Sequence, residues 1–223
     1  MPDIKRVRAI LFDIDDTLFA STDFSKKARR AAIRAMVRAG LPTTEKKAQE
    51  LLNQIISKVG SNSQNHFDLL CKKLNAKDKS KIVASGIRAY HDSKRNLKPY
   101  RGVKQLLSQL RKAGYILCIA TEGIPKKQWD KLIRLSLQDS FDHVFISQEL
   151  GINKSPLFYK RICKILGFRP ENCLMVGDSP VADILYSNMA GLISVRILKG
   201  KNKNKHCKSD FEIKEITDLL KLL

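Results

Sequence analysis

Short, continuous apolar runs recur along the chain and alternate with stretches that have helical spacing. The first run, Ala9–Phe12, is followed at once by Asp13. A run of this kind predicts a strand that is buried on both faces, as in a parallel sheet. We predict further strands of the same character at 115–121, 143–147, 173–177 and 193–198. A short edge strand is predicted at 211–213.

Helical patterns separate these runs, and several of them end at a glycine, a common signal for a helix C-terminus. The predicted helices cover residues 103–113, 126–135, 156–166 and 181–190, and a last helix is expected over 214–222. Strands that alternate with helices predict an open α/β fold with right-handed crossovers. We therefore expect a Rossmann-like, three-layer core with a parallel sheet.

One connection is much longer than a crossover requires. About a hundred residues separate the first predicted strand from the second, whereas a crossover helix needs only a dozen or more. Helices are predicted within this interval at 24–39, 45–59, 65–74 and 79–90. We therefore predict two domains: residues 1–19 with 99–223 form the core, and residues 20–98 form a small all-helical domain.

The composition limits the class of protein. Hydrophobic residues make up 43% of the chain, which allows a sizeable core, and no apolar run is long enough to cross a membrane. The segment Met1–Arg6 has neither the apolar region nor the cleavage site of a signal peptide. Five cysteines without a CxxC spacing indicate a reducing compartment. These features predict a cytoplasmic protein.

The chain is strongly basic, with a formal net charge of +20, and its surface is expected to attract anions. Residues 20–98 contain 18 Lys/Arg and six Asp/Glu, including a stripe with four-residue spacing at Lys26, Arg30, Arg34 and Arg38. We interpret the stripe as a solvated helix face, with attraction of anionic substrates as the alternative. The lysine-rich segment 199–208 is interpreted as a mobile surface loop. Nucleic acid is not an expected partner, because the basic stretches contain no recognition motif and few aromatic residues.

Acidic residues stand where the first strand ends. Asp13 and Asp15 are two residues apart, and an open α/β sheet binds ligands outside the carboxyl ends of its strands. Crowded carboxylates are electrostatically costly unless a cation lies between them or one stays protonated. The pair therefore suits a metal ion and acid/base chemistry. A strand-end turn with solvated acids, in which Thr17 caps a helix, explains the pair alone equally well.

The fourth predicted strand favours the chemical interpretation. It delivers Asp178 at its end, and Ser179 and Asp183 follow near the start of the next helix. If the first and fourth strands are neighbours, Asp13 and Asp178 converge at one edge of the sheet. Oxygen ligands together with several waters are the usual coordination of Mg²⁺.

Two more strand ends supply groups that suit an anionic ligand. Thr121 and Glu122 follow the second strand, where a hydroxyl and backbone amides could grip phosphate oxygens. Lys154 stands after the third strand and just before a helix, where a cation can neutralise a phosphoryl group. Each residue alone is more often part of a solvated surface, but the ordered set favours a functional site.

This ordered set resembles the haloacid dehalogenase (HAD) superfamily. The four motifs of that superfamily are matched in order by Asp13–Thr17, Thr121, Lys154 and Gly177–Asp183. The helical insertion at 20–98 resembles the type-one cap of subfamily I. Asp16 stands where a glycine is more often found, although phosphatase members also have an aspartate there.

The resemblance implies a phosphoric monoester hydrolase that uses Mg²⁺ and forms an aspartyl-phosphate. Asp13 is then the nucleophile and Asp15 the acid/base, and the metal is held by Asp13, the backbone carbonyl of Asp15, and Asp178. Dehalogenases of the superfamily lack an acid at the position of Asp15, which favours phosphate chemistry. The resemblance implies that the substrate phosphate is bound by Thr121, Glu122 and Lys154. It implies a supporting role for Thr17, Ser179 and Asp183.

Residues 12–21 and 24–31 are similar to an archaeal branch of the superfamily that is associated with glyceraldehyde 3-phosphate phosphatase activity. The resemblance makes this compound the leading substrate, and other small phosphorylated metabolites stay open. A phosphomutase, which passes the phosphoryl group to another hydroxyl, is a second enzymatic interpretation. A basic nucleic-acid-binding protein on the same scaffold is the alternative from a different class. The sequence makes no prediction of the oligomeric state.

Overall fold

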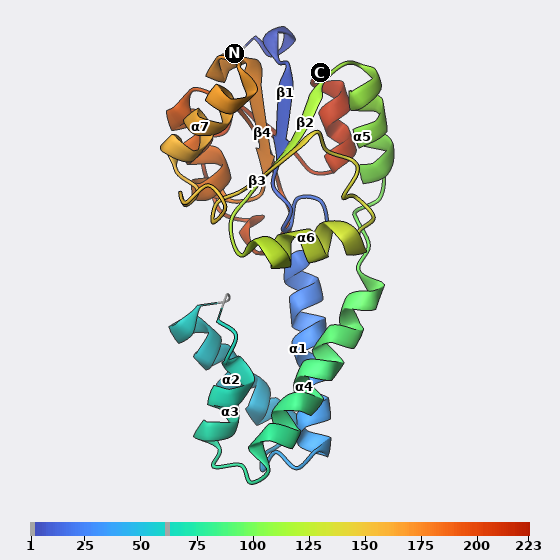
Figure 1. The fold of residues 1–223 in the computed structure, drawn as a ribbon, viewed down its shortest axis with the longest axis vertical. Coiled ribbons are helices and arrows are strands. Elements are labelled where there is room, and N and C mark those ends of the chain that lie inside the picture. Colours follow the sequence, from blue (N-terminus) through green and yellow to red (C-terminus); the bar gives the residue numbers. More distant parts are fainter. Residues whose placement is uncertain (1–2, 61–62) are drawn as a thin grey trace. The chain divides into compact units, whose positions relative to one another are not determined.

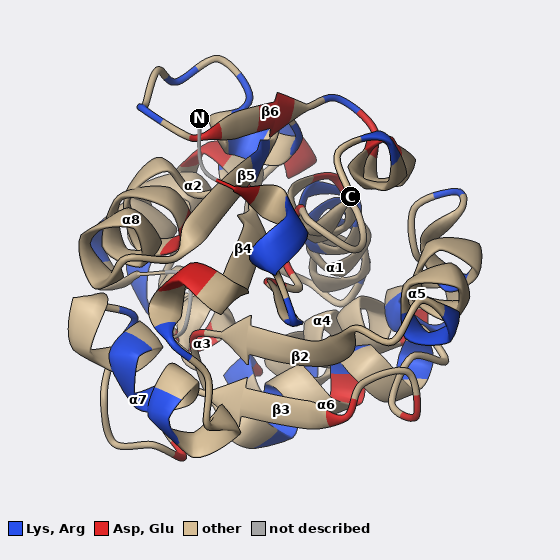
Figure 2. Ribbon diagram, turned by 90° about the horizontal axis from the view of Figure 1, so that it is seen from above, with Lys and Arg blue, Asp and Glu red and all other residues tan. Residues whose placement is uncertain are grey.

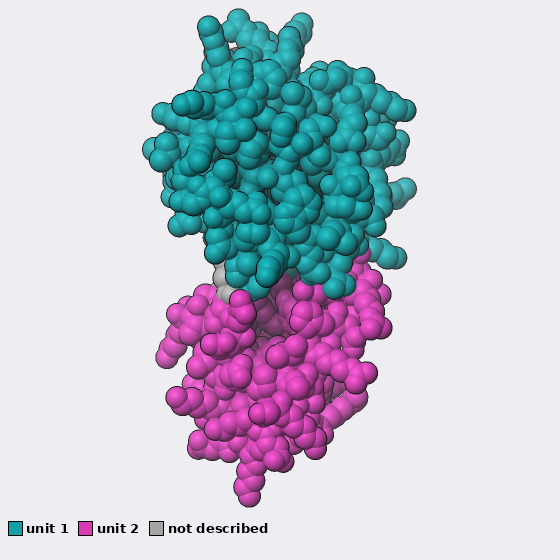
Figure 3. Space-filling model, viewed as in Figure 1, with its two compact units in different colours: residues 1–22, 98–223 teal, residues 23–97 magenta. Residues whose placement is uncertain are grey.

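The computed structural model describes residues 3–60 and 63–223 (Figure 1). The chain divides into two compact units, residues 1–22 with 98–223 and residues 23–97 (Figure 3). These bounds lie within three residues of the predicted domain boundaries. The predicted domains also include residues 1–2 and 61–62, which lie outside the described residues.

The first unit contains a six-stranded sheet in the order β3-β2-β1-β4-β5-β6, and every neighbouring pair is parallel. The strands are β1 (Ala9–Phe12), β2 (Ile116–Thr121), β3 (His143–Ile146), β4 (Cys173–Gly177), β5 (Ile193–Ile197) and β6 (Phe211–Ile213). All four residues of β1 and all five of β4 are buried, as their continuous apolar character predicted. The predicted α/β fold with a parallel sheet is confirmed.

Helices cover both faces of this sheet, which gives the predicted three layers (Figure 2). α7 (Pro156–Leu166) and α8 (Tyr186–Ala190) lie on one face, and α5 (Val103–Lys112) lies on the other (Figure 1). α6 (Pro125–Arg134) follows β2. Charged residues lie mainly on the helices and connections, whereas β1 to β4 contain none (Figure 2).

Two predicted helices differ from the structure. The segment predicted as one helix over 181–190 is a π-helical turn, Pro180–Leu185, followed by the short helix α8. The segment predicted as a helix over 214–222 is a 3₁₀ helix, Ile216–Lys221, which begins at a capping box between Glu215 and Asp218. Other 3₁₀ turns occur at Ile4–Arg6, Lys94–Asn96, Pro170–Asn172 and Gly200–Asn202.

The second unit is built from helices. They are α1 (Ser21–Arg38), whose first residues belong to the first unit, α2 (Glu45–Val59), α3 (His66–Lys73) and α4 (Lys79–Ser93). Apolar residues from all four helices, among them Met36, Leu52, Leu70 and Ile82, form a core of its own. The four basic residues of the predicted stripe on α1 are exposed, as both interpretations of the stripe require.

Within the described residues, none of the helices combines the length and the apolar character that crossing a membrane requires. All five cysteines lie in the described part of the chain as free thiols, and four of them are buried.

Candidate active site

The first and fourth strands are neighbours, as the convergence of their acidic residues required. In the parallel pairing of β1 with β4, Phe12 lies opposite Val176. The amide of Asp13 extends this ladder by donating to the carbonyl of Val176 at 3.0 Å. β1 pairs with β2 on its other side and β4 pairs with β5, so the connections that follow β1 and β4 leave in opposite directions. Such a switch point is where open α/β sheets bind ligands.

Three buried carboxylates meet at this point, and we call Asp13, Asp178 and Asp183 the carboxylate cluster. One oxygen from each lies within 4.8 Å of the others, and the exposed fractions of the residues are 6%, 6% and 0%. Lys154 enters the cluster and donates from Nζ to Asp13 Oδ1 at 2.7 Å and to Asp183 Oδ1 at 2.6 Å. The structure thus brings four of the predicted site residues together.

Local structure explains how Lys154 and Asp183 reach the cluster. Lys154 precedes Ser155, whose hydroxyl accepts from the amide of Phe158 at 3.3 Å and so caps α7. The amide of Ser179 donates to Asp183 Oδ2 at 2.9 Å. At Gly177, a Cβ atom would collide with the Asp183 side chain. Glycine at the end of β4 therefore gives the carboxylate of Asp183 the room that it needs.

Burial and mutual repulsion disturb the ionisation of the cluster. Burial, followed by the charges of Asp13 and Asp183, raises the pKa of Asp178 to about 8. Burial also raises the pKa of Asp183 to about 6, although Lys154 counteracts it. Burial alone would lower the pKa of Lys154, but Asp13 and Asp183 raise it well above its ordinary value. The lysine therefore stays charged, and negative charge is in excess around it.

A divalent cation fits this cluster. Three carboxylates face a single buried lysine, so at full ionisation they carry more negative charge than Lys154 neutralises. Carboxylate oxygens are the ligands that hard divalent cations prefer, and a bound cation would offset the burial and the repulsion that raise the pKa of Asp178.

Asp15 lies outside the carboxylate cluster and has a cation of its own. Lys131 of α6 donates from Nζ to Asp15 Oδ2 at 2.5 Å and to Gln128 Oε1 at 3.1 Å. The Asp15 side chain is 41% exposed, but its Oδ1 is buried and has no hydrogen-bond partner among the described residues. Burial of this end raises the pKa of Asp15, Lys131 lowers it, and Asp13 raises it further.

Lys131 is not among the residues predicted for the site. It lies inside the predicted helix 126–135, where a lysine is ordinary, and it reaches Asp15 across 116 positions of the chain. Only the pairing of β1 with β2, which places α6 near the end of β1, could have singled it out.

The remaining predicted residues occupy the same edge of the sheet with different surroundings. Thr121 is buried at the end of β2, one residue beyond Ala120. The Glu122 side chain is exposed, and its carbonyl accepts from Gln128 Nε2 at 2.8 Å. The amide of Gly123 donates to Ser147 Oγ at 3.1 Å, so this backbone amide is already engaged.

Thr17 and Ser179 differ in their partners. Thr17 is fully buried, and its hydroxyl has no hydrogen-bond partner among the described residues. It does not cap a helix, because α1 begins at Ser21. Asp16 instead binds the first turn of α1. The amide of Thr22 donates to Asp16 Oδ1 at 2.9 Å, and the hydroxyl of Thr22 donates to Asp16 Oδ2. Ser179 Oγ accepts from the amide of Ala182 at 3.2 Å, which caps the π-helical turn.

One further segment reaches the cluster and corrects a prediction. Residues 199–208, interpreted as a mobile surface loop, contain the 3₁₀ turn Gly200–Asn202, and Asn202 is only 5% exposed. Its Nδ2 donates to Asp178 Oδ2 at 2.8 Å. The sequence pattern did not mark Asn202 as buried, because it lies among lysines in a loop that is exposed at most of its other positions.

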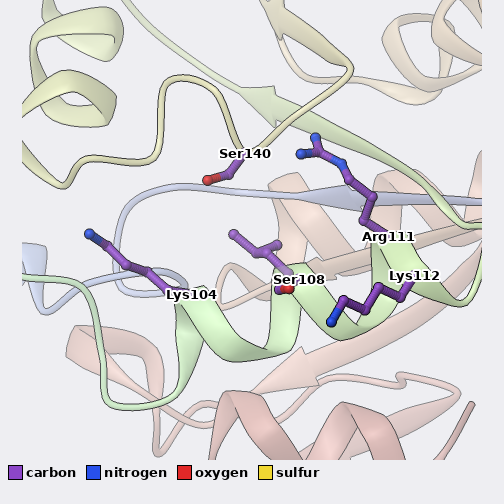
Figure 4. Close-up of a pocket in the computed structure, with 6 residues that line it drawn as sticks. Lys104, Ser108, Arg111, Lys112 and Ser140 are labelled. Carbon is purple, nitrogen blue, oxygen red and sulfur yellow. The ribbon is translucent and has the colours of Figure 1, made fainter.

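A pocket lies between α5 and the loop that contains Ser140, away from these residues (Figure 4). It is lined by Lys104, Leu107, Ser108, Arg111, Lys112 and Ser140. None of the predicted site residues lines it, and its basic side chains project from the helix surface rather than from a buried cradle (Figure 4). The candidate chemistry therefore lies at the carboxylate cluster.

The chain is similar to proteins of a known family. The sequence profile of the haloacid dehalogenase-like hydrolase family matches residues 7–191. A Methanopyrus kandleri protein named glyceraldehyde 3-phosphate phosphatase is 41% identical over 96% of each chain, and a Methanocaldococcus jannaschii protein of the same name is 40% identical over 97% of each. Among solved structures, a putative beta-phosphoglucomutase from Thermotoga maritima has a TM-score of 0.77 at 22% identity, covering 97% of this chain and 100% of its own.

Proposed function

Because this chain belongs to the haloacid dehalogenase-like hydrolase family, we propose that it is a magnesium-dependent phosphatase acting on glyceraldehyde 3-phosphate. The observation that carries the proposal is Lys154 held between Asp13 and Asp183 at the switch point of the sheet, with Asp178 beside them. The substrate rests on five relatives named glyceraldehyde 3-phosphate phosphatase, which are 37–41% identical to this chain.

In the proposed reaction, a carboxylate oxygen of Asp13 attacks phosphorus and the bond from phosphorus to the ester oxygen breaks. Asp15 gives its proton to the leaving oxygen, and the product alcohol departs. Asp15 then takes a proton from water, whose oxygen attacks the phosphorus of the aspartyl-phosphate and frees phosphate and Asp13. The raised pKa of Asp15 supports its role as the acid.

The other residues bind and orient. In this proposal Lys154, which donates a hydrogen bond to Asp183, neutralises the phosphoryl group, and Asp183 orients Lys154. The Thr121 hydroxyl and the backbone amide of Glu122 are proposed to donate to the phosphoryl oxygens. Thr17 supports the segment that follows β1, and Ser179 supports the segment that follows β4. Mg²⁺ would be held by Asp13, Asp178 and the backbone carbonyl of Asp15, and when bound it offsets the repulsion between anionic substrate and anionic nucleophile.

We further propose that residues 20–98 act as the cap that selects the substrate. This segment is the basic, all-helical second unit, and the four basic residues on α1 that are exposed suit an anionic substrate.

The test is phosphate release from a panel of phosphorylated metabolites with Mg²⁺ and no added acceptor. Glyceraldehyde 3-phosphate should rank at or near the top, and phosphate release without an acceptor separates a phosphatase from a phosphomutase. D13N and D15N should each lower turnover at least about a hundredfold, given the usual contribution of acid/base groups. D139N, at an exposed acid of the same unit, is the matched control and should keep full activity.

Two results would contradict the proposal. Glyceraldehyde 3-phosphate near the bottom of the panel would reject the substrate, and near-normal turnover by either D13N or D15N would reject the mechanism.

A further inference from the structure

A buried arginine interrupts an otherwise uncharged strand beside the site. Arg196 lies on β5, opposite Gly177 of β4, and is only 2% exposed. A buried guanidinium is costly unless its donors are well paired. Arg196 Nη1 lies 3.3 Å from Glu212 Oε1, but Nε has no hydrogen-bond partner among the described residues. The ion pair with Glu212 therefore satisfies only part of the guanidinium group.

The best contact of Arg196 is with the turn that reaches the carboxylate cluster. Its Nη2 donates to the backbone carbonyl of Asn202 at 2.8 Å, and this hydrogen bond is buried. The side chain of the same residue, Asn202, donates from Nδ2 to Asp178 Oδ2 at 2.8 Å, and this hydrogen bond is also buried. Arg196 therefore fixes the backbone of the residue whose side chain fixes Asp178.

The same turn is held against a second acidic residue. Gly200 has φ +62°, and a Cβ atom there would collide with the carboxylate of Asp16. The turn Gly200–Asn202 thus lies against the loop after β1 as well as the loop after β4. A displacement of the turn would release one oxygen of Asp178.

We propose that Asn202 and Arg196 are positioning residues for a divalent cation at the carboxylate cluster. Asn202 occupies one oxygen of Asp178 and restricts rotation of the carboxylate, which leaves the other oxygen available to the cation. Arg196 acts through Asn202 by holding the turn. This inference rests on the proposed function, because it concerns the metal site of that reaction. Outer-shell hydrogen-bond partners of metal ligands typically change metal affinity about 10–100-fold when they are removed.

The experiment measures Mg²⁺ binding directly, by calorimetric titration of the full-length, metal-stripped protein without substrate. N202A and R196M should each weaken Mg²⁺ binding by about tenfold or more. The double variant should bind no more weakly than N202A alone, because both substitutions break one chain of contacts. N204A, at an exposed asparagine two positions along the same loop, should bind like the wild type.

Activity gives a second measurement that a general structural defect would not reproduce. N202A should require about tenfold more Mg²⁺ for half-maximal turnover, while the KM for substrate at saturating Mg²⁺ stays that of the wild type. If R196M fails to fold, N202A decides the question, because Asn202 lies in a loop whose backbone contacts the substitution keeps.

The outcomes separate this inference from the proposed function. Wild-type Mg²⁺ affinity in folded N202A would overturn the positioning role while leaving the phosphatase proposal intact. Additive losses in the double variant would overturn the action of Arg196 through Asn202. A wild-type protein that neither binds Mg²⁺ nor releases phosphate would overturn the proposed function itself.

Discussion

Lys154 offers a quantitative test of the candidate site, because its two ion pairs are buried. Its side chain is 3% exposed, and those of Asp13 and Asp183 are 9% and 1% exposed. Breaking a buried pair by removing one partner typically costs about 3–5 kcal/mol, since the remaining charge is left uncompensated. An exposed pair such as Arg6 with Asp3, 67% and 51% exposed, contributes about 0–1 kcal/mol.

The substitution K154M keeps the aliphatic bulk and removes the charge. In metal-free protein at about pH 8 we expect the free energy of unfolding to fall by about 3–5 kcal/mol. For a chain of this size this corresponds to a decrease in Tm of roughly 6–20 °C. The loss should shrink towards pH 5, because Asp183, whose pKa is already raised to about 6, can take up a proton.

The assay is urea unfolding followed by the fluorescence of Trp129, the single tryptophan, which lies on α6 in the same unit as Lys154. K160M, an exposed lysine on α7, is the matched control and should change stability by less than about 0.5 kcal/mol. A loss below about 1 kcal/mol for K154M would show that Lys154 behaves like a surface residue, and it would refute the buried arrangement.

Two further predictions concern Asp15 and the response to pH. K131M removes the cation that holds Asp15, so kcat should fall by up to about a hundredfold because the acid is misplaced. The Mg²⁺ affinity measured by calorimetry should stay unchanged. An unchanged kcat would contradict this prediction. Asp178 and Asp183 have pKa values raised to about 8 and about 6, so the folded, metal-free protein retains protons that the unfolded chain releases. The free energy of unfolding of the metal-free protein should therefore fall as pH rises from about 4 to about 8, and saturating Mg²⁺ should remove this fall. Chemical unfolding across this pH range measures the effect. A rise in the stability of the metal-free protein with pH would contradict the prediction.

Most of the fold could be predicted because its elements are encoded locally. β1 and β4 are continuous apolar runs that end in an acid or in glycine and an acid, and α7 begins at a serine cap followed by proline. α2 and α7 have the bounds that their spacing predicted.

The predictions failed where a distant contact sets the local structure. The segment after Ser179 has helical spacing, but its first part forms a π-helical turn. In this turn Asp183 accepts from the backbone amide of Ser179 and from the side-chain Nζ of Lys154. At the C-terminus the apolar spacing suited an α-helix, whereas the chain from Ile216 forms a 3₁₀ helix.

The site shows the same division. Asp13, Asp178, Asp183 and Lys154 follow strand ends, so the topology of a parallel sheet is enough to bring them together. Lys131 lies within a helix and Asn202 within a lysine-rich loop, so neither position is marked by the local pattern.

The central claim is that Asp13 carries the phosphoryl group during turnover. The most direct test quenches the protein in acid during hydrolysis of glyceraldehyde 3-phosphate with Mg²⁺, reduces the acyl-phosphate with borohydride, and locates the modified residue by mass spectrometry. We predict modification at Asp13, dependent on Mg²⁺ and absent from D13N. Modification of another residue, or phosphate release by D13N at a normal rate, would contradict the account.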